Sequence, residues 1–225
     1  LPILSSALKA GNEKKVNKIQ NKSLELSLLL SAPACAGLII ASEEIVNALF
    51  GYGSFKPEDV KLTSKALMYF GFGIPAFAII KIFANLFFAR HNTETPFHIS
   101  LVVVLINVFI SLIFFKSIGF IIIPIATSIS AWVGAIIYVF LLIGRKYLIF
   151  KKDNIINALK IILSTILMSL ALLLALEYFN SQLMYSNSFK FIYVLFIVLS
   201  LAMFYLLLCN LMGILKIKKD NNYQV

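Results

Sequence analysis

Long apolar segments alternate with short polar ones along the whole chain. Leu24–Ile40, Ile99–Phe115 and Phe191–Leu208 are examples that together hold one charged residue, Glu25. A helix of roughly 20 apolar residues crosses the hydrocarbon core of a bilayer. The pattern therefore predicts an all-α integral membrane protein, a polytopic helical bundle of six full transmembrane helices at 24–42, 60–90, 97–115, 120–143, 155–176 and 191–213.

The polar segments and the Gly and Pro residues indicate where the predicted helices begin, end or are interrupted. Residues 9–22 are predicted to be a basic loop, and 45–50 a short helix lying at the membrane interface. The segment 60–90 is expected to be interrupted by Gly71–Pro75, since Gly and Pro weaken helices. Thr95 is the expected N-cap of the next helix, with Pro96 in its first turn.

Composition strengthens the membrane interpretation. The 225 residues are 60% hydrophobic and 13% charged, whereas soluble domains are about 25% charged. The net charge of +10 comes from Lys and Arg residues between apolar segments, which is typical of positive-inside topology with anionic membrane lipids as partners. No basic face with interleaved aromatic residues is present, so we expect no nucleic-acid partner.

The charges alternate from one polar segment to the next. Most Lys and Arg residues fall at 9–22, 90–95, 144–154 and in the tail at 216–219. The polar segments between these, which would lie on the opposite side of the membrane, contain Lys together with Glu and Asp and so have a lower net positive charge. The positive-inside rule therefore places the basic loops and the C-terminus in the cytoplasm. We divide the chain into 1–23, a helix end plus a basic loop; 24–145, four helices; and 146–225, two helices and a basic tail.

Motifs for catalysis are missing from the sequence. There is no GxSxG motif and no Gly-rich phosphate loop, and His91 and His98 do not have the spacing of metal ligands on one helix face. Cys35 and Cys209 both fall in apolar segments, where packed thiols are expected. We therefore expect a protein that is not an enzyme and has no catalytic residues or cofactor.

Polar residues inside the spans are the remaining candidates, because they are costly in a membrane. Lys81 lies about 13 Å from the helix end at Arg90, at 1.5 Å per residue. A lysine side chain cannot easily reach the interface from that depth. The favoured interpretation is that Lys81 faces a water-filled substrate cavity, and the alternative is snorkelling into a thinned bilayer.

Asn107 and Ser111 are one helical turn apart, and Thr127 follows Pro124 in the next span. From spacing alone, interhelical hydrogen bonding is favoured over a cation site for these three residues. Pro33, Pro75 and Pro124 are candidates for helix kinks.

Four short motifs follow one another along the chain: Leu1-Pro2-Ile3-Leu4-Ser5, Leu49-Phe50-Gly51-Tyr52-Gly53-Ser54-Phe55, Tyr69 to Phe77 followed by Lys81, and Phe88 to Pro96. In this order they resemble the C-terminal half of the MurJ (MviN) family of lipid II flippases. They cover about residues 1–145, while the last two spans match in number and hydropathy alone. Phe88 stands where the family commonly has Tyr, and Asn92 where it commonly has Asp.

The resemblance implies a C-terminal lobe of a fourteen-helix, two-lobe transporter in the bacterial inner membrane. Its substrate would be lipid II, an undecaprenyl-linked peptidoglycan precursor used in cell wall biosynthesis, moved by alternating access. The N-terminal lobe of the same protein would be the partner of this chain, which is expected to be a fragment. A sodium site of some members would correspond to Asn107 and Thr127, and its carboxylate would fall at Ser111, which has none.

Two alternatives stay open. The chain could be part of another transporter of the same superfamily, a polysaccharide-lipid flippase or a cation-coupled drug exporter, or it could be a membrane scaffold that transports nothing. The coupling source, sodium or the membrane potential, is also left open.

Overall fold

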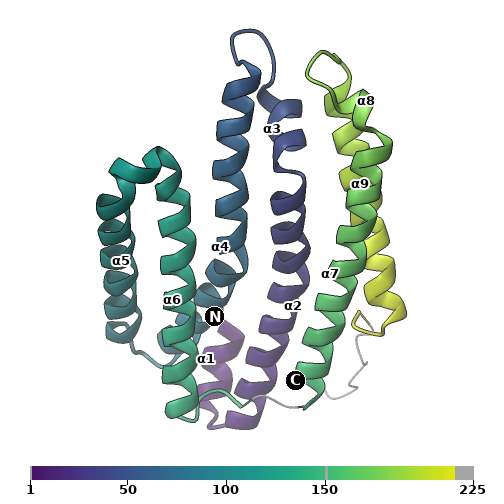
Figure 1. Cartoon of the computed structure of the whole chain (residues 1–225). Helices are drawn as coiled ribbons and strands as arrows, with labels where there is room; N and C mark the ends of the chain where they lie inside the picture. The colour runs from purple at the N-terminus through teal and green to yellow at the C-terminus, as the bar shows by residue number, and fades with distance from the viewer. Residues whose placement is uncertain (1, 150–151, 216–225) are drawn as a thin grey trace.

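The computed structural model describes residues 2–149 and 152–215, in which every regular element is a helix (Figure 1). Leu1, Phe150, Lys151 and the predicted basic tail 216–225 lie outside the described residues. The elements in order are α1 (Pro2–Lys9), α2 (Glu13–Ile40), α3 (Ser42–Phe50), α4 (Pro57–Ala89), α5 (Glu94–Ile118), the 3₁₀ helix η1 (Gly119–Ile121), α6 (Ile122–Gly144), α7 (Lys152–Tyr178), α8 (Asn180–Leu183) and α9 (Lys190–Leu211).

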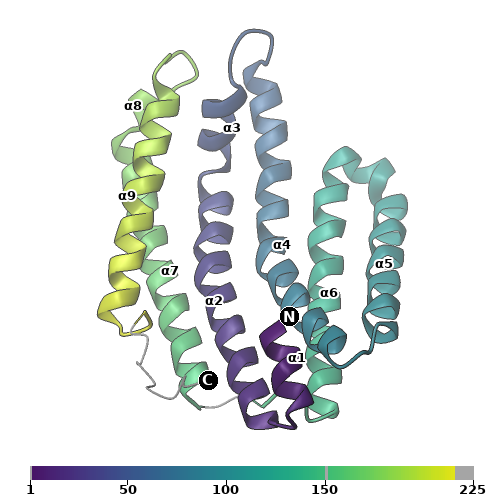
Figure 2. The same ribbon diagram turned by 180° about the vertical axis from the view of Figure 1, so that it is seen from behind.

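Five helical segments are long and apolar enough to cross a membrane: Glu13–Ile40, Pro57–Ala89, Glu94–Gly144, Lys152–Tyr178 and Lys190–Leu211. The third segment contains both α5 and α6, which lie side by side as a hairpin (Figures 1 and 2). The chain reverses at Gly119, whose φ of 72° lies in the left-handed region that glycine adopts without a steric penalty.

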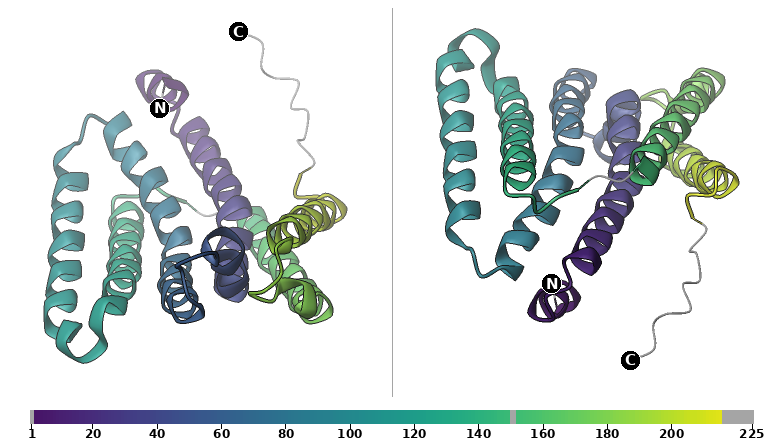
Figure 3. Two further views of the ribbon diagram at one scale, coloured as in Figure 1. Left: turned by 90° about the horizontal axis from the view of Figure 1, so that it is seen from above. Right: turned by 90° about the horizontal axis from the view of Figure 1, so that it is seen from below.

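The helices form a row with α2 near its centre. On one side α2 packs against α4, which packs against α6, and α5 lies beyond α6 (Figures 1 and 3). On the other side α2 packs against α7, which pairs with α9 (Figures 1 and 3). The short α3 bridges the two sides, because it contacts both α4 and α9. The proposed division at residue 145 is not tested by this arrangement and stays a prediction.

Small residues allow α4 and α6 to approach closely. Ala76, Ala131 and Ala135 form a buried cluster between them, and a Cβ added to Gly73 would lie 2.9 Å from the Ser128 hydroxyl oxygen. Small residues at helix interfaces are the usual means of close packing in membranes. A larger core of Phe83, Phe87 and other residues joins α4 to α6 nearer the end at which α1 lies.

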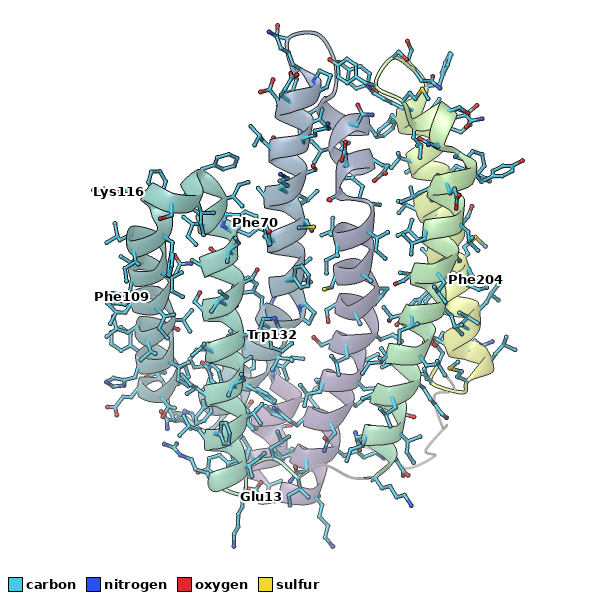
Figure 4. All side chains as sticks on the ribbon, in the orientation of Figure 1. Glu13, Phe70, Phe109, Lys116, Trp132 and Phe204 are labelled. Carbon is cyan, nitrogen blue, oxygen red and sulfur yellow. The ribbon has the colours of Figure 1, made fainter. Side chains whose placement is uncertain are left out.

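Much of the apolar surface faces outward, as a membrane protein requires. Phe109 and Leu112 of α5 are 67% and 74% exposed. Figure 4 shows Phe109 on the outer side of the hairpin, between the helix end that bears Lys116 and the opposite end of the molecule, where Glu13 lies. In a bilayer this surface meets lipid or another part of the protein.

Three predictions about local structure were wrong. Residues 13–22 belong to α2 and not to a loop, since Asn12 caps the helix by accepting a hydrogen bond from the Lys15 amide at 2.9 Å. The long helix α4 is continuous from Pro57 to Ala89 through Gly71–Pro75. The helix α5 begins at Glu94, with Thr93 as its N-cap residue, because the Asn92 side chain accepts from the Thr95 amide within the first turn. The helix expected at 45–50 is confirmed as part of α3, which begins earlier, at Ser42, and its location at the membrane interface stays a prediction.

Candidate functional site

The side chains of Asn107 and Thr127 meet between α5 and α6. Nδ2 of Asn107 donates to Oγ1 of Thr127 at 2.9 Å, and the Thr127 hydroxyl donates to the Ile123 carbonyl at 2.8 Å. Ser111 lies one turn further along α5, and its buried Oγ has no hydrogen-bond partner among the described residues. The structure therefore brings Asn107 and Thr127 into contact and leaves the Ser111 hydroxyl unpaired.

These three residues offer neutral oxygen atoms and no carboxylate. Within residues 2–149 and 152–215, no group of three or more His, Cys, Asp or Glu side chains gathers where it could hold a metal ion. Hard cations prefer oxygen ligands, and a site without a carboxylate provides no opposite charge for them. The contact acts as an interhelical hydrogen bond in this structure, and cation binding here stays a prediction.

Lys81 lies on an exposed face of α4 and makes no hydrogen bond or ion pair with the described residues. Asn85 lies one turn further along the same face and lines a cavity of about 240 Å³ between α1, α2 and α4. Gln20 lines this cavity too; it is 2% exposed, and its Nε2 has no partner among the described residues. We call Lys81, Asn85 and Gln20 the polar strip.

Sequence reasoning missed two members of the polar strip. Asn85 is a polar residue inside an apolar span, so it could have been identified as a candidate from the sequence in the same way as Lys81. Gln20 was assigned to a loop, and its burial follows from the extension of α2 that the polar pattern did not predict.

The three candidate prolines occupy different positions. Pro33 and Pro75 lie inside α2 and α4, where each removes a backbone hydrogen-bond donor. Pro124 lies in the first turn of α6, where an amide has no partner within the α-helix in any case. Pro33 and Pro75 therefore stay candidates for kinks, and Pro124 is placed as a helix-start residue.

Arg90 joins three elements at the end of the molecule where α1 lies. Its guanidinium donates to both carboxylate oxygens of Glu13, at 3.0 and 2.8 Å, and lies 3.8 Å from the ring centroid of Tyr147. The bidentate pair ties the end of α4 to the start of α2. Arg90 therefore has a structural role within this chain.

Lys190 is the buried cation at the opposite end. It is 1% exposed, and its Nζ donates to Asn47 Oδ1 at 3.1 Å and to the carbonyls of Gly51 and Tyr185 at 2.6 and 2.8 Å. The rings of Tyr52 and Tyr185 lie 4.2 and 4.5 Å from Nζ. We call these residues the Lys190 clasp, which ties the start of α9 to α3 and to the α3–α4 loop.

The chain is similar to known proteins over most of its length. The sequence model of the family described as "Lipid II flippase MurJ" matches residues 1–215. A probable lipid II flippase MurJ of Rhizobium meliloti is 39% identical over 145 residues, 64% of this chain and 27% of that protein. A probable lipid II flippase MurJ of Rickettsia prowazekii is 39% identical over 132 residues, 59% of this chain and 26% of that protein.

The fold agrees with these matches. A solved structure described as "Lipid II flippase MurJ, inward closed conformation" superposes with a TM-score of 0.71 and 27% identity, covering 93% of this chain and 42% of that one. The matched regions make up about a quarter of the length of the two curated relatives named above, 27% and 26%, so the chain corresponds to only part of those proteins.

Proposed function

The chain belongs to the lipid II flippase MurJ family, and from this we propose that the full-length protein moves lipid II from the cytoplasmic to the outer leaflet of the bacterial inner membrane. The observation that carries the proposal is the family match over residues 1–215 of 225. Because the matches cover only part of the relatives' length, 27% and 26% of the two curated proteins and 42% of the solved one, the activity is proposed for the full-length protein. The family consists of transporters, so no covalent chemistry is involved.

The finer topology is part of this proposal. The hairpin of α5 and α6 crosses the membrane twice, so that the five candidate segments make six crossings. The junction of α1 with α2, the α4–α5 loop and the α6–α7 loop gather at one end of the bundle, and all three carry Lys or Arg (Figure 1). The positive-inside rule supports a cytoplasmic location for this end and for the C-terminus. The chain then forms the C-terminal lobe of a fourteen-helix, two-lobe transporter.

The polar strip supports a role for this lobe in substrate passage. A headgroup bearing a pyrophosphate meets a high barrier in hydrocarbon, and a wet cavity with positive charge lowers that barrier. Lys81 is exposed on this chain and unpaired among the described residues, so its ammonium is available to such a cavity between the two lobes. Rocking of one lobe against the other would then give alternating access.

Coupling to a cation would involve Asn107 and Thr127, with Ser111 beside them. The proximity of the first two side chains across α5 and α6, 2.9 Å between Nδ2 and Oγ1, supports this, and a bound cation would replace their hydrogen bond. A site made of neutral oxygens would bind sodium weakly, which leaves the membrane potential as the alternative coupling source.

The test is rescue of cells depleted of their own lipid II flippase. The full-length protein should restore growth and cell shape, and should expose newly made lipid II to a reagent that acts only at the outer leaflet. Residues 1–225 alone serve as the control and should not rescue, because the cavity needs both lobes. Full-length protein that inserts in the membrane but restores neither readout would exclude lipid II transport.

A further inference from the structure

A second cavity lies at the basic end of the molecule, on the side of α2 that faces the start of α7. Its volume is about 520 Å³. Its lining includes Lys15, Lys18 and Lys22 of α2, together with Ile3 of α1 and Asn154 of α7. The three lysines share one face of α2, because residues three, four and seven positions apart lie on the same side of a helix.

The lining of this cavity is positively charged. Its three lysines and one carboxylate, Glu25, sum to a formal charge of +2, in which Lys22 and Glu25 form an ion pair and Lys15 and Lys18 supply the excess positive charge. Both oxygens of Glu25 are already engaged, since Lys22 Nζ donates to Oε1 at 2.6 Å and Asn157 Nδ2 donates to Oε2 at 3.0 Å. The Lys22–Glu25 pair therefore holds one wall of the cavity together and is close to neutral toward an incoming anion.

The same face of α2 turns apolar immediately beyond the lysines. Leu26 and Leu30, one and two turns after Lys22, are 48% and 70% exposed. Ile3, at the rim, is 67% exposed. A ligand that fills the cavity and follows this face must therefore have a charged end beside the lysines and an apolar body along the leucines, the profile of a lipid molecule at the membrane interface.

We propose that this cavity binds the phosphate headgroup of an anionic phospholipid, with an acyl chain along Leu26 and Leu30. Basic pockets between transmembrane helices on the cytoplasmic side are suited to such headgroups. A phosphodiester carries one negative charge and several acceptor oxygens, which match the ammonium donors and the net charge of the lining. This site concerns a resident lipid and does not depend on the proposed transport of lipid II.

The test measures lipid binding to the full-length protein in neutral detergent. Phosphatidylglycerol, phosphatidylcholine and inorganic phosphate are titrated separately, and the adducts are counted by native mass spectrometry. The double variant Lys15→Gln with Lys18→Gln leaves the Lys22–Glu25 ion pair in place. The matched control, Lys9→Gln with Lys14→Gln, removes the same charge from exposed positions at the same end that do not line the cavity.

We expect the wild type to prefer phosphatidylglycerol over phosphatidylcholine and to ignore inorganic phosphate. The cavity double variant should lose about thirtyfold in affinity for phosphatidylglycerol, at about 1 kcal/mol per lysine, and the control should keep the wild-type value. Equal losses of phosphatidylglycerol affinity in the two variants would mean that the lipid responds only to the overall positive charge of this end of the protein, and would overturn the proposed site. Binding of free phosphate as strong as that of the lipid would also overturn it.

A second measurement covers the case in which the double variant does not fold. Leu26→Trp is made together with Trp132→Phe, which removes the single native Trp. Phosphatidylglycerol with brominated acyl chains should quench the new Trp more strongly than brominated phosphatidylcholine does. Equal quenching by the two lipids would show that no anionic lipid is held beside Leu26.

Discussion

Replacing Lys190 by Met should destabilise the protein strongly, because Lys190 is buried and fully coordinated. Its ammonium serves three acceptors, Asn47 Oδ1 and the carbonyls of Gly51 and Tyr185, at 2.6 to 3.1 Å. Lys190 is also the first residue of α9, where a positive charge opposes the helix dipole. The clasp must offset both this repulsion and the loss of water around the ammonium.

The expected size of the effect follows from these contacts. Met retains most of the apolar stem of Lys190 but leaves three acceptors without their donor. A buried acceptor left unpaired costs about 1–3 kcal/mol. At the low end of that range, about 1 kcal/mol each, the three acceptors together give about 3 kcal/mol. Removal of one partner from a buried charged contact costs a similar amount, about 3–5 kcal/mol. For a folding unit of the length of this chain, about 3 kcal/mol lowers Tm by roughly 6–12 °C.

The measurement is thermal unfolding of the purified protein in detergent. The control is Lys116→Met, which removes an exposed lysine at the end of α5 (Figure 4) and should change stability by less than about 0.5 kcal/mol. Combining Lys190→Met with Asn47→Ala should cost less than the sum of the two single changes, since the residues are in contact. A Tm for Lys190→Met within about 2 °C of the control would refute the clasp as a stabilising element.

Three further predictions concern transport and topology. Lys81→Met should leave the protein inserted and folded but slow the appearance of lipid II in the outer leaflet, and Lys81→Arg should retain more activity; undiminished transport by Lys81→Met would reduce Lys81 to a packing or snorkelling residue. Sodium should raise the Tm of the wild type only slightly, and Ser111→Asp should enlarge that increase by adding the missing negative charge; an unchanged response would remove Ser111 from any cation site. A single cysteine at Ser54 should react with a membrane-impermeant reagent applied from outside, and one at Lys15 should not; the opposite pattern would invert the proposed orientation.

The helices of this fold could be predicted from sequence because hydropathy and helix length are properties of contiguous residues. Errors arose where polarity was taken to mean a loop. The basic residues 13–22 stay helical because the Asn12 cap starts α2 well before its apolar part, and a helix is as regular in water as in lipid. Gly71–Pro75 does not interrupt α4, because the small residues there let α2 and α6 pack close to the helix.

The candidate site was predictable only where its residues are near each other in sequence. Asn107 and Thr127 lie in consecutive helices joined by a tight turn, so their contact follows from the hairpin that the sequence predicts. Lys190 could not be identified in this way, since Asn47 and Gly51 lie 143 and 139 positions away. Its sequence position at the edge of a span resembles an ordinary interface lysine, and only the packing of α3 against α9 shows that it is buried.

Lys190 and Lys81 together show how one residue type takes on different roles in different surroundings. A charge removed from water must be compensated, and for Lys190 the compensation is complete within this chain: three oxygen acceptors and two aromatic rings. Lys81 has no such partner among the described residues. Its compensation must therefore come from water, from a ligand or from protein outside these helices. Each of these sources is compatible with the substrate cavity proposed for Lys81, whereas water at the membrane interface is also what a snorkelling lysine would reach. Transport by Lys81→Met therefore distinguishes the two roles.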